Sequence, residues 1–494
     1  MKQALIAFAL LLVASQMSAQ TDFETYKQQE QQKLKEYNQQ KRNFKAYSQK
    51  QREEFEAYRA KLNAEYAEHM RKAWAQFGSH AAKPIPQRPE PPQPVVRIPD
   101  EKPQQKVLPI GKVVVPVVPA EPIAPVVPLP EVRPEPSGFS FMYYGTPCHV
   151  SLTDAHSYRL QGVSENQVAD AWALLSGDKY LSVLAECAEY RKALNLCDWG
   201  YVRLLQVMTE NFFAQDGHNE AVLMQMYLLV QSGYKVRIAR TDNRLVLLLP
   251  IAQEVYGYSY LTIDGIPYYI MDKGVKGKSF HVFNHSFPQE RLLSLYIHST
   301  PDLKVKSTAL RTLTDSRQLK TTVAVNKNLI DFYNDYPLSA QWNFYSLASL
   351  SSKAKSALYP KLRQTIEGKS RVEAANILLH FVQTAFDYQT DDVQFGVERP
   401  LFADEMLYYP YCDCEDRSIF YSILVRDLLG LDVVLLNYPR HLATAVCFDA
   451  DVSGDHIVLG NRRFIICDPT YINASVGESM PKLKQEKIEV VVLE

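Results

Sequence analysis

Large apolar side chains recur at a regular spacing in residues 21–77, a segment rich in Gln, Lys and Glu that lacks Gly and Pro. An 11-residue period is about 3.67 residues per turn and places them in a nearly straight stripe along a helix. We expect a long helix over 20–78, which either associates as a coiled coil through this stripe or is a solvated spacer. The pairs begin 11, 10 and 11 residues apart, and a fifth follows: Phe23 and Tyr26, Leu34 and Tyr37, Phe44 and Tyr47, Phe55 and Tyr58, Leu62 and Tyr66.

Before this helix, the hydrophobic pattern is that of an export signal. Met1 and Lys2 precede the apolar run "ALIAFALLLVA", and small residues follow near Ala19. This order predicts a signal peptide over residues 1–19 and a periplasmic or secreted protein. No later run reaches about 18 apolar residues, so we expect no transmembrane segment in the mature chain.

After the helix, proline interrupts the pattern every few residues. The segments "PIPQRPEPPQPVVRIPD" and "VVVPVVPAEPIAPVVPLPEVRPEP" both lie within residues 79–137. Such sequences favour extended polyproline II structure. We therefore expect a semi-rigid Pro-rich linker that holds a folded body away from an anchor or partner.

The rest of the chain repeats one order of elements: helix, glycine, strand, turn, strand. It occurs in "NEAVLMQMYLLVQSGYKVRIARTDNRLVLLLP" (219–250) and in "DRSIFYSILVRDLLGLDVVLLNYPRHLATAVCF" (416–448). Gly233 and Gly430 hold the same place, after a helix where a left-handed residue is needed. Helices and strands in both segments predict an α+β fold.

The repeat predicts a tandem duplication, with a first half at 138–300 and a second half at 301–494. The offset between the copies grows from 174 at Leu204 and Leu378 to 197 at the two glycines. The second half therefore has 23 extra residues, which we assign to the acidic and aromatic segment 387–411, called the insertion below. A chance likeness between two helix-and-sheet units is the alternative.

Charge and cysteine content limit the classes of partner. The formal net charge is −1, so there is no basic surface of the kind that binds nucleic acid. An exported chain permits disulfides, and seven cysteines leave at least one thiol free within the chain. Cys412 is a candidate disulfide partner of Cys447 or Cys467, and Cys187 of Cys197.

Three residue types needed for thiol chemistry follow in order. Cys414 lies at the start of a predicted helix, where free N–H groups and the helix dipole favour a thiolate. His441 begins a strand 27 residues later, and Asp468 ends another strand after 27 more. Adjacent antiparallel strands can bring the two together, so that His441 acts as base and Asp468 fixes its tautomer. A backbone N–H at the helix start can stabilise the oxyanion.

Cysteine at a helix start, histidine at a strand start and then "DPT" resemble the transglutaminase-like superfamily of papain-like fold. "CEDRS" is similar to that superfamily's Cys-x-Asp helix opening. The resemblance covers roughly residues 370–475 and, more weakly, 198–275. It implies Cys414 as nucleophile, His441 as base and Asp468 as orienting acid.

The same resemblance gives roles to the neighbours of the triad. It implies that Asp416 bonds the backbone or Arg417 at the helix start. Tyr409 or Tyr411 is the candidate for supporting the oxyanion, because no upstream Gln or Trp is evident. The family often has a glycine two residues before the nucleophile, and this sequence has Cys412 at that position.

The first half lacks this chemistry. At an offset of 197 for the first two positions and 196 for the aspartate, the triad corresponds to Gly217, Arg244 and Asp272, so neither a thiol nor an imidazole remains. We interpret the first half as a degenerate copy that binds a ligand or braces its partner. In the second half the insertion is expected to build a substrate wall suited to a polar or cationic peptide.

Two function classes follow. The first is an exported cysteine peptidase or amidohydrolase, which acts on peptide or isopeptide bonds through a thioester at Cys414 and needs no cofactor. The second is a non-enzymatic envelope scaffold or peptide-binding module with a vestigial site. Substrate identity, and hydrolysis versus cross-linking, stay open.

Simpler interpretations of each residue remain. Cys414 could be a buried structural thiol, or Cys412 the nucleophile instead. His441 and Asp468 could each serve only in a turn. Zinc held by Cys412, Cys414, Cys467 and His441 is disfavoured, because C-x-C spacing is too tight for the common knuckle.

Overall fold

The chain, taken here as a computed structural model, divides into two compact units, Met1–Glu65 and Tyr66–Glu494. The structure describes residues 2–86 (side chains from 32 on), 94–97, 105–119, 123–125, 127–129, 137–214, 216–272, 274–275 and 279–493.

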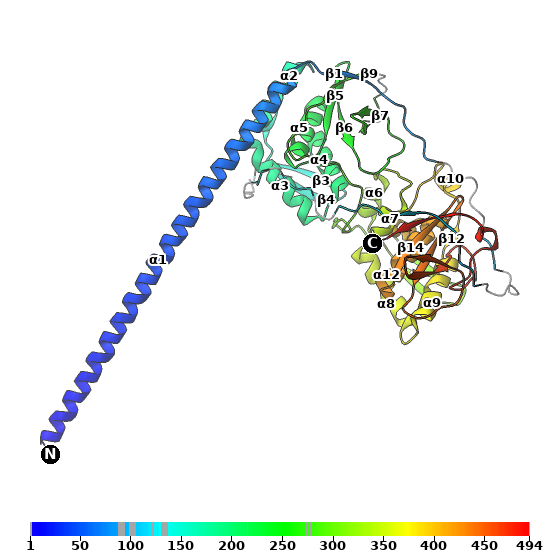
Figure 1. The fold of residues 1–494 in the computed structure, drawn as a ribbon. Helices are drawn as coiled ribbons and strands as arrows, with labels where there is room; N and C mark the ends of the chain where they lie inside the picture. The colour runs from blue at the N-terminus through cyan, green and yellow to red at the C-terminus, as the bar shows by residue number, and fades with distance from the viewer. Residues whose placement is uncertain are drawn as a thin grey trace. The chain divides into compact units, whose positions relative to one another are not determined.

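Helix α1 runs without a break over Lys2–Met70 (Figure 1). Leu34, Tyr37, Phe44 and Tyr47 of the stripe face solvent and are 60 to 71% exposed, whereas Tyr66 at its end is buried. Self-association through the stripe stays a prediction, as does the signal peptide at residues 1–19. In the part of the chain that is described, no helix has the length and hydropathy needed to cross a membrane.

The expectation that the helix continues to residue 78 is wrong. α1 ends at Met70, whose carbonyl accepts a hydrogen bond from Trp74 Nε1 at 2.9 Å. Such a bond satisfies one of the carbonyls that every helix end leaves open. Strand β1, Ala75–Gly78, then pairs with β9, Ser279–Phe283, so backbone pairing with a distant segment replaces helix in these residues.

The first half contains a six-stranded sheet in the order β1-β9-β5-β6-β8-β7. Helix α5 packs against β6 and α4 packs against α5 (Figure 1). The further strands are β5 Arg237–Thr241, β6 Arg244–Pro250, β7 Tyr260–Ile263 and β8 Ile266–Ile270, and the helices are α2 Glu165–Leu175, α3 Lys179–Ala193, α4 Asp198–Phe213 and α5 His218–Gln231.

The second half contains a six-stranded sheet in the order β16-β17-β15-β14-β18-β2, and helix α12 packs on β14 and β15. Its strands are β2 Ile110–Val114, β14 Asp432–Tyr438, β15 His441–Cys447, β16 His456–Leu459, β17 Arg462–Cys467 and β18 Ile488–Val492. Its helices are α6 Lys327–Asn334, α7 Trp342–Leu347, α8 Ser352–Ile366, α9 Arg371–Thr384, α10 Asp391–Gln394, α11 Ala403–Tyr408 and α12 Cys414–Leu429.

Short elements complete the two halves. Antiparallel pairs join β3 to β4 and β10 to β11, and a parallel pair joins β12 to β13. Their bounds are β3 Phe139–Tyr143, β4 Thr146–Val150, β10 Arg311–Thr314, β11 Lys320–Val323, β12 Asp387–Tyr388 and β13 Tyr411–Cys412, and two 3-10 turns cover Asp154–His156 and Pro481–Leu483.

The two sheets have the same strand order. Read from its other edge, the second sheet runs β2-β18-β14-β15-β17-β16, which matches β1-β9-β5-β6-β8-β7 in five strands. The edge strands differ in direction, because β2 is parallel to β18 whereas β1 is antiparallel to β9. The hairpin registers also agree, because Thr241 pairs with Arg244 as Tyr438 pairs with His441. Arg244 and His441 therefore begin equivalent strands, and the α+β class expected from the sequence is confirmed.

The Pro-rich linker is not a free spacer over its whole length. Ile110–Val114 forms β2, which pairs in parallel with β18 at the edge of the second sheet. Val96 and Val107 form isolated bridges to Ile472 and His456. The spacer prediction is wrong at these positions, because the proline-free run between prolines 109 and 116 can form ladder bonds on an edge strand.

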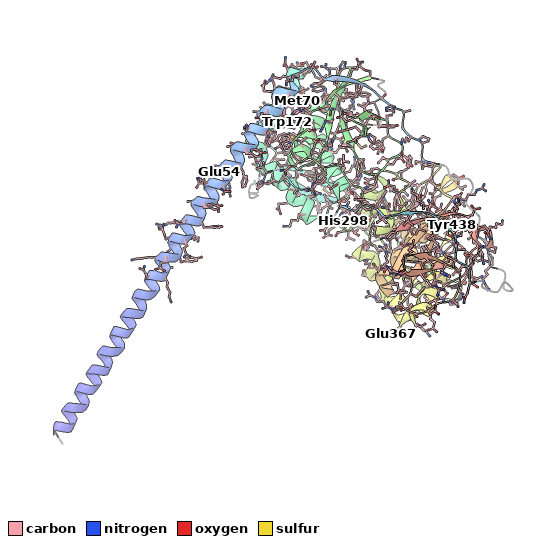
Figure 2. All side chains as sticks on the ribbon, in the orientation of Figure 1. Glu54, Met70, Trp172, His298, Glu367 and Tyr438 are labelled. Atoms are coloured by element: carbon pink, nitrogen blue, oxygen red, sulfur yellow. The ribbon has the colours of Figure 1, made fainter. Side chains whose placement is uncertain are left out.

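Each sheet has its own apolar core. One cluster includes Ala239, Val246, Leu248 and Phe280, and the other includes Val434, Leu436, Ala445 and Ile466. Figure 2 labels Trp172 in the first half and Tyr438 in the second, both among densely packed side chains. Because the strand side chains in these clusters are closely packed, residues at the strand ends are held in fixed positions.

Candidate functional site

Cys414 is the first residue of α12. Asp413 caps the helix, and the backbone N–H of Asp413 donates to Asp416 Oδ2 at 3.2 Å. Asp416 Oδ1 accepts from Leu401 N at 2.8 Å, so this carboxyl binds backbone on both sides of the helix start. A side chain at the first helical position lies among N–H groups without intrahelical partners. The helix start thus offers N–H groups near the thiol, although acidic side chains also gather there, as described below.

His441 and Asp468 form a hydrogen-bonded pair. His441 Nε2 lies 2.9 Å from Asp468 Oδ2, and the two residues are 0% and 1% exposed. Asp468 Oδ1 accepts from the backbone of Thr470 at 2.9 Å and of Tyr471 at 3.2 Å, which fixes the carboxylate. With the proton on Nε2, the lone pair is on Nδ1, a buried atom that has no hydrogen-bond partner among the described residues.

A hydrogen bond joins the thiol-bearing helix to the histidine-bearing strand. Ser418 Oγ, one turn after Cys414, donates to the carbonyl of Leu442 at 2.7 Å, and Leu442 follows His441. The first turns of α12 are thus held against the start of β15. The structure brings the three predicted triad positions to one end of the helix–sheet interface.

The thiol donates to a carboxylate in this structure. Cys414 Sγ donates to Glu415 Oε2 at 3.0 Å, and both residues are 0% exposed. Glu415 is therefore a second base that competes with His441 for the thiol proton. Its sequence position, next to the cysteine inside "CEDRS", gave no reason to expect this contact.

Five acidic residues gather at the helix start: Asp391, Glu398, Asp413, Glu415 and Asp416, called the acid cluster below. Burial, followed by the charge of neighbouring carboxylates, raises the pKa of Asp391 to about 10, that of Asp416 to about 8 and that of Asp413 well above its usual value. Subsets with oxygens within 4.8 Å could hold a divalent cation. The raised pKa values favour protonated acids, and a bound cation is the alternative that the acid cluster offers.

Tyr388 adjoins the thiol, although sequence reasoning did not select it. β12 pairs with β13 so that Tyr388 lies opposite Cys412. Burial, then the negative charges of Cys414, Asp413 and Glu415, raises the pKa of Tyr388 above its usual value. Its hydroxyl is buried, stays protonated and has no hydrogen-bond partner among the described residues.

Tyr409 and Tyr411 have different surroundings. Tyr409 OH donates to Asn334 Oδ1 at 2.7 Å, and Tyr411 is exposed on β13. Their expected support of an oxyanion is untested. Tyr388 is a further candidate hydroxyl, and only the parallel pairing of two two-residue strands reveals it.

Gln383 anchors the loop that carries Asp468. Its Nε2 lies 3.1 Å from the Asp468 carbonyl, 2.8 Å from that of Tyr471 and 3.1 Å from that of Ala474. Its Oε1 accepts from Asn473 N at 3.2 Å. In the sequence, Gln383 is a lone glutamine on an apolar helix face, which could have drawn attention to it. Its hydrogen-bond partners lie some 90 residues later in the chain, so the sequence does not indicate them.

We expect Gln383→Ala to lower the free energy of unfolding by about 2–3 kcal/mol, because it leaves buried loop carbonyls without a donor. Denaturant titration would measure the loss. Gln364→Ala, which removes an exposed glutamine of α8, is the matched control and should change stability by less than about 0.5 kcal/mol. Equal effects of the two variants would contradict the anchoring role.

The other thiols are placed apart from this chemistry. All seven cysteines are free, so none of the disulfides considered above forms in the structure. Burial raises the pKa of Cys412 and of Cys148 to about 11, and that of Cys467 to about 12. The proposed zinc set of Cys412, Cys414, Cys467 and His441 is not among the close ligand groups of the described residues.

The insertion packs inward onto the helix start. Leu401, Phe402 and Ala403 are buried, and Leu401 N reaches Asp416 as given above. The three triad residues are almost without exposed surface. Whether the insertion also forms a substrate wall is untested, and in this structure it contributes to closing the site.

The equivalent positions of the first half form a polar cluster. Gly217 precedes α5, Arg244 begins β6, and Asp272 follows β8. Arg244 Nε donates to Asp272 Oδ2 at 3.0 Å, and Arg244 Nη2 lies 3.3 Å from His218 Nδ1. The first half thus has an arginine–aspartate ion pair, with His218 beside the arginine, where the second half has a histidine–aspartate pair.

The chain was compared with known proteins at three levels. No protein-family model, curated protein or solved structure matches it.

Proposed function

We propose that the chain is an exported, thiol-dependent acyl-transfer enzyme, a cysteine peptidase or amidohydrolase of transglutaminase-like type. The observation that carries the proposal is the 2.9 Å pair of His441 Nε2 and Asp468 Oδ2, with Nδ1 left open at the same end of the interface as Cys414. The matching strand orders of the two sheets support a tandem duplication in which only the second half retains the triad.

In the proposed reaction, His441 Nδ1 takes the thiol proton and Cys414 Sγ attacks the carbonyl carbon of a peptide or isopeptide bond. The oxyanion is stabilised by backbone N–H groups at the start of α12 and by the Tyr388 hydroxyl. Collapse breaks the C–N bond, and the imidazolium protonates the leaving amine. Water, or a second amine, then attacks the thioester while His441 takes its proton. The C–S bond breaks, the acid or new amide leaves, and the imidazolium returns the proton to the Cys414 thiolate.

Substrate entry requires the site to open. A triad with almost no exposed surface cannot meet a substrate in the arrangement described here. The insertion, which docks on α12 through Leu401 and Asp416, is the segment that we propose moves. The same burial favours the second candidate function, a peptide-binding envelope protein whose site no longer reacts.

Acyl-enzyme trapping separates the two functions. The full chain is incubated with an N-acetyl peptide p-nitrophenyl ester, and the acyl adduct is mapped by peptide mass spectrometry. We expect the adduct on Cys414 in the wild type and in Cys447→Ser, which removes a less buried thiol. No Cys414 adduct in the wild type, or unchanged total labelling in Cys414→Ala, would reject the enzymatic function.

A further inference from the structure

The first half has a large cavity at the positions that correspond to the triad. It has a volume of about 710 Å³, within the range of sites for small organic ligands and short peptides. Its walls come from α4, α5, β6 and the segment after β8, together with residues 334–338 and Arg399 from the second half. This first-half pocket is independent of the thiol chemistry.

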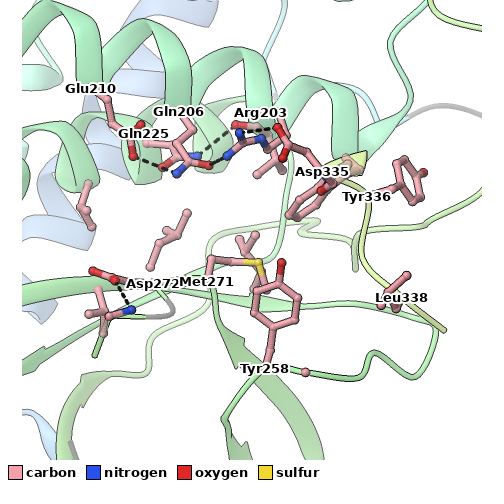
Figure 3. A pocket seen from close by; sticks show the side chains of 18 of the residues that line it. Arg203, Gln206, Glu210, Gln225, Tyr258, Met271, Asp272, Asp335, Tyr336 and Leu338 are labelled. Carbon is pink, nitrogen blue, oxygen red and sulfur yellow. Dashed lines mark hydrogen bonds and ion pairs between the residues drawn. The ribbon is translucent and has the colours of Figure 1, made fainter. Parts of the chain in front are cut away.

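One wall is a row of polar groups along α4 (Figure 3). Arg203, Gln206 and Glu210 are three and four residues apart and therefore share one face of the helix. Gln206 Nε2 donates to Glu210 Oε1 at 2.8 Å, and Arg203 Nη1 donates to Gln206 Oε1 at 2.6 Å. Arg203 Nη2 also lies 3.0 Å from Asp335 Oδ2, so this arginine is fully engaged.

Carboxylate groups on this wall retain hydrogen-bonding capacity. Glu210 is exposed and uses Oε1 for Gln206, and Asp335 uses Oδ2 for Arg203 and for the hydroxyl of Tyr144. No described partner takes up the second oxygen of either carboxylate. The wall therefore favours a cationic group, such as an ammonium, on the ligand.

The facing wall carries a cationic side chain, that of Arg244. Asp272, Met271 and Tyr258 lie opposite the row on α4 (Figure 3). The Arg244 side chain is 47% exposed although it pairs with Asp272, and its bonds to Asp272 and His218 use Nε and Nη2. Nη1 is left for a carboxylate, the group that an arginine fork binds best.

Apolar and amide groups lie between the charged ends. Val246, Leu249 and Leu338 line the cavity with Tyr256. Gln225, only 5% exposed, donates to the Val202 carbonyl at 3.0 Å through Nε2 and also lines the cavity. The lining has equal numbers of arginines and carboxylates, namely Arg203, Arg244 and Arg399 with Glu210, Asp272 and Asp335.

We propose that the first-half pocket binds a short peptide that carries both a free carboxylate and a free ammonium group. The carboxylate binds Arg244, and the ammonium binds Glu210 or Asp335. Among the described residues the lining has no excess of positive charge, which favours a ligand with both charges over a polyanion such as a nucleotide. The degenerate copy thus recognises peptide ends and does not react with them.

Calorimetric titration of the full chain carrying Cys414→Ala tests the proposal without turnover at that thiol. The probes are the tripeptide Ala-Lys-Ala with free ends, its C-terminal amide and its Nα,Nε-diacetylated form. We expect the free peptide to bind, and each modification to weaken binding about tenfold, the effect of losing one charged hydrogen bond. No binding at millimolar peptide, or equal binding of all three forms, would overturn the proposal.

Two variants locate the contacts. Arg244→Gln should abolish the discrimination between carboxylate and amide, and Glu210→Gln should reduce the discrimination against the acetylated form. Arg462→Gln is the matched control, since Arg462 also begins a strand, pairs with an aspartate (Asp432) and is 45% exposed. Discrimination that survives Arg244→Gln, or that Arg462→Gln removes equally, would refute the assignment of the carboxylate to Arg244.

Discussion

His441→Gln should slow the alkylation of Cys414 at pH 6, relative to its rate at pH 9, by roughly 200-fold. A thiol with the ordinary pKa of about 8.5 is about 0.3% ionised at pH 6 and about 75% ionised at pH 9. If His441 accepts the proton, the wild-type thiol is ionised at both pH values and its two rates are similar. Iodoacetamide labelling followed by peptide mass spectrometry gives both rates.

The ratio of rates is the informative quantity, because Cys414 is buried. Reagent reaches a buried thiol only when the site opens, so every rate contains the opening equilibrium. Comparing the ratio of the two rates in the variant with the same ratio in the wild type largely cancels this factor, because both proteins carry the acid cluster. Glutamine keeps most of the volume of the imidazole, which limits any change in opening.

Glu415→Gln provides the decisive comparison. Glu415 accepts a hydrogen bond from the thiol in the structure, and a negative charge on Glu415 opposes a thiolate beside it. We expect Glu415→Gln to keep or raise labelling at pH 6, since it removes a competing base and a like charge. Loss of labelling in Glu415→Gln but not in His441→Gln would assign the base to Glu415 and would refute the proposed triad.

Labelling of the other buried cysteines should be slow, because their thiols stay protonated. Burial keeps the thiols of Cys148, Cys412 and Cys467 protonated, with pKa values raised to about 11, about 11 and about 12. Cys447 is only partly buried, so it reports on the reactivity of an ordinary thiol in the same sample. A slow Cys447 beside a fast Cys414 at pH 6 would show that the site, and not exposure, sets the rate.

The features predictable from sequence are those set by local pattern. Gly233 and Gly430 have φ values of +91° and +63°, as helix ends in the left-handed region require. The tight turns before Arg244 and His441 have the same register, so an offset counted along the sequence places both residues at the start of equivalent strands. Periods of 2 and 3.6 residues carry this information without knowledge of distant contacts.

The features missed depend on pairing between distant segments. β2 joins the second sheet through β18, which lies more than 370 residues later in the chain, and nothing local in a proline-rich stretch indicates that partner. Tyr388 and Gln383 gain their positions from a two-residue parallel pair and from three loop carbonyls. The burial of the triad likewise depends on how the insertion folds back, which residue spacing does not specify.

The acid cluster makes stability fall as pH rises, and Asp391→Asn should remove part of that fall. The pKa of Asp391 is raised to about 10, chiefly by burial and then by Asp416, while an unfolded aspartate has a pKa near 3.9. Between those values the folded state holds a proton that the unfolded state releases. This contribution to stability is fully present below about pH 4 and is lost as pH rises toward 10, at up to about 1.4 kcal/mol per pH unit.

Thermal unfolding at pH 5 and pH 8, with EDTA present, measures the effect. Over these three pH units the wild type loses up to about 4 kcal/mol of stability. The difference in melting temperature between pH 5 and pH 8 should therefore be smaller in Asp391→Asn. Asparagine keeps an acceptor for the 2.6 Å hydrogen bond from Arg399 N. Asp392→Asn, at an exposed neighbour, should leave the gap unchanged. If Asp391→Asn instead widens the gap, or if added Ca²⁺ stabilises only the wild type at pH 8, the carboxylates are ionised around a cation. The acids of the acid cluster can be accommodated either by protonation or by binding a cation. Protonation makes stability fall as pH rises, whereas cation binding makes it rise, so the sign of the pH dependence of stability distinguishes them.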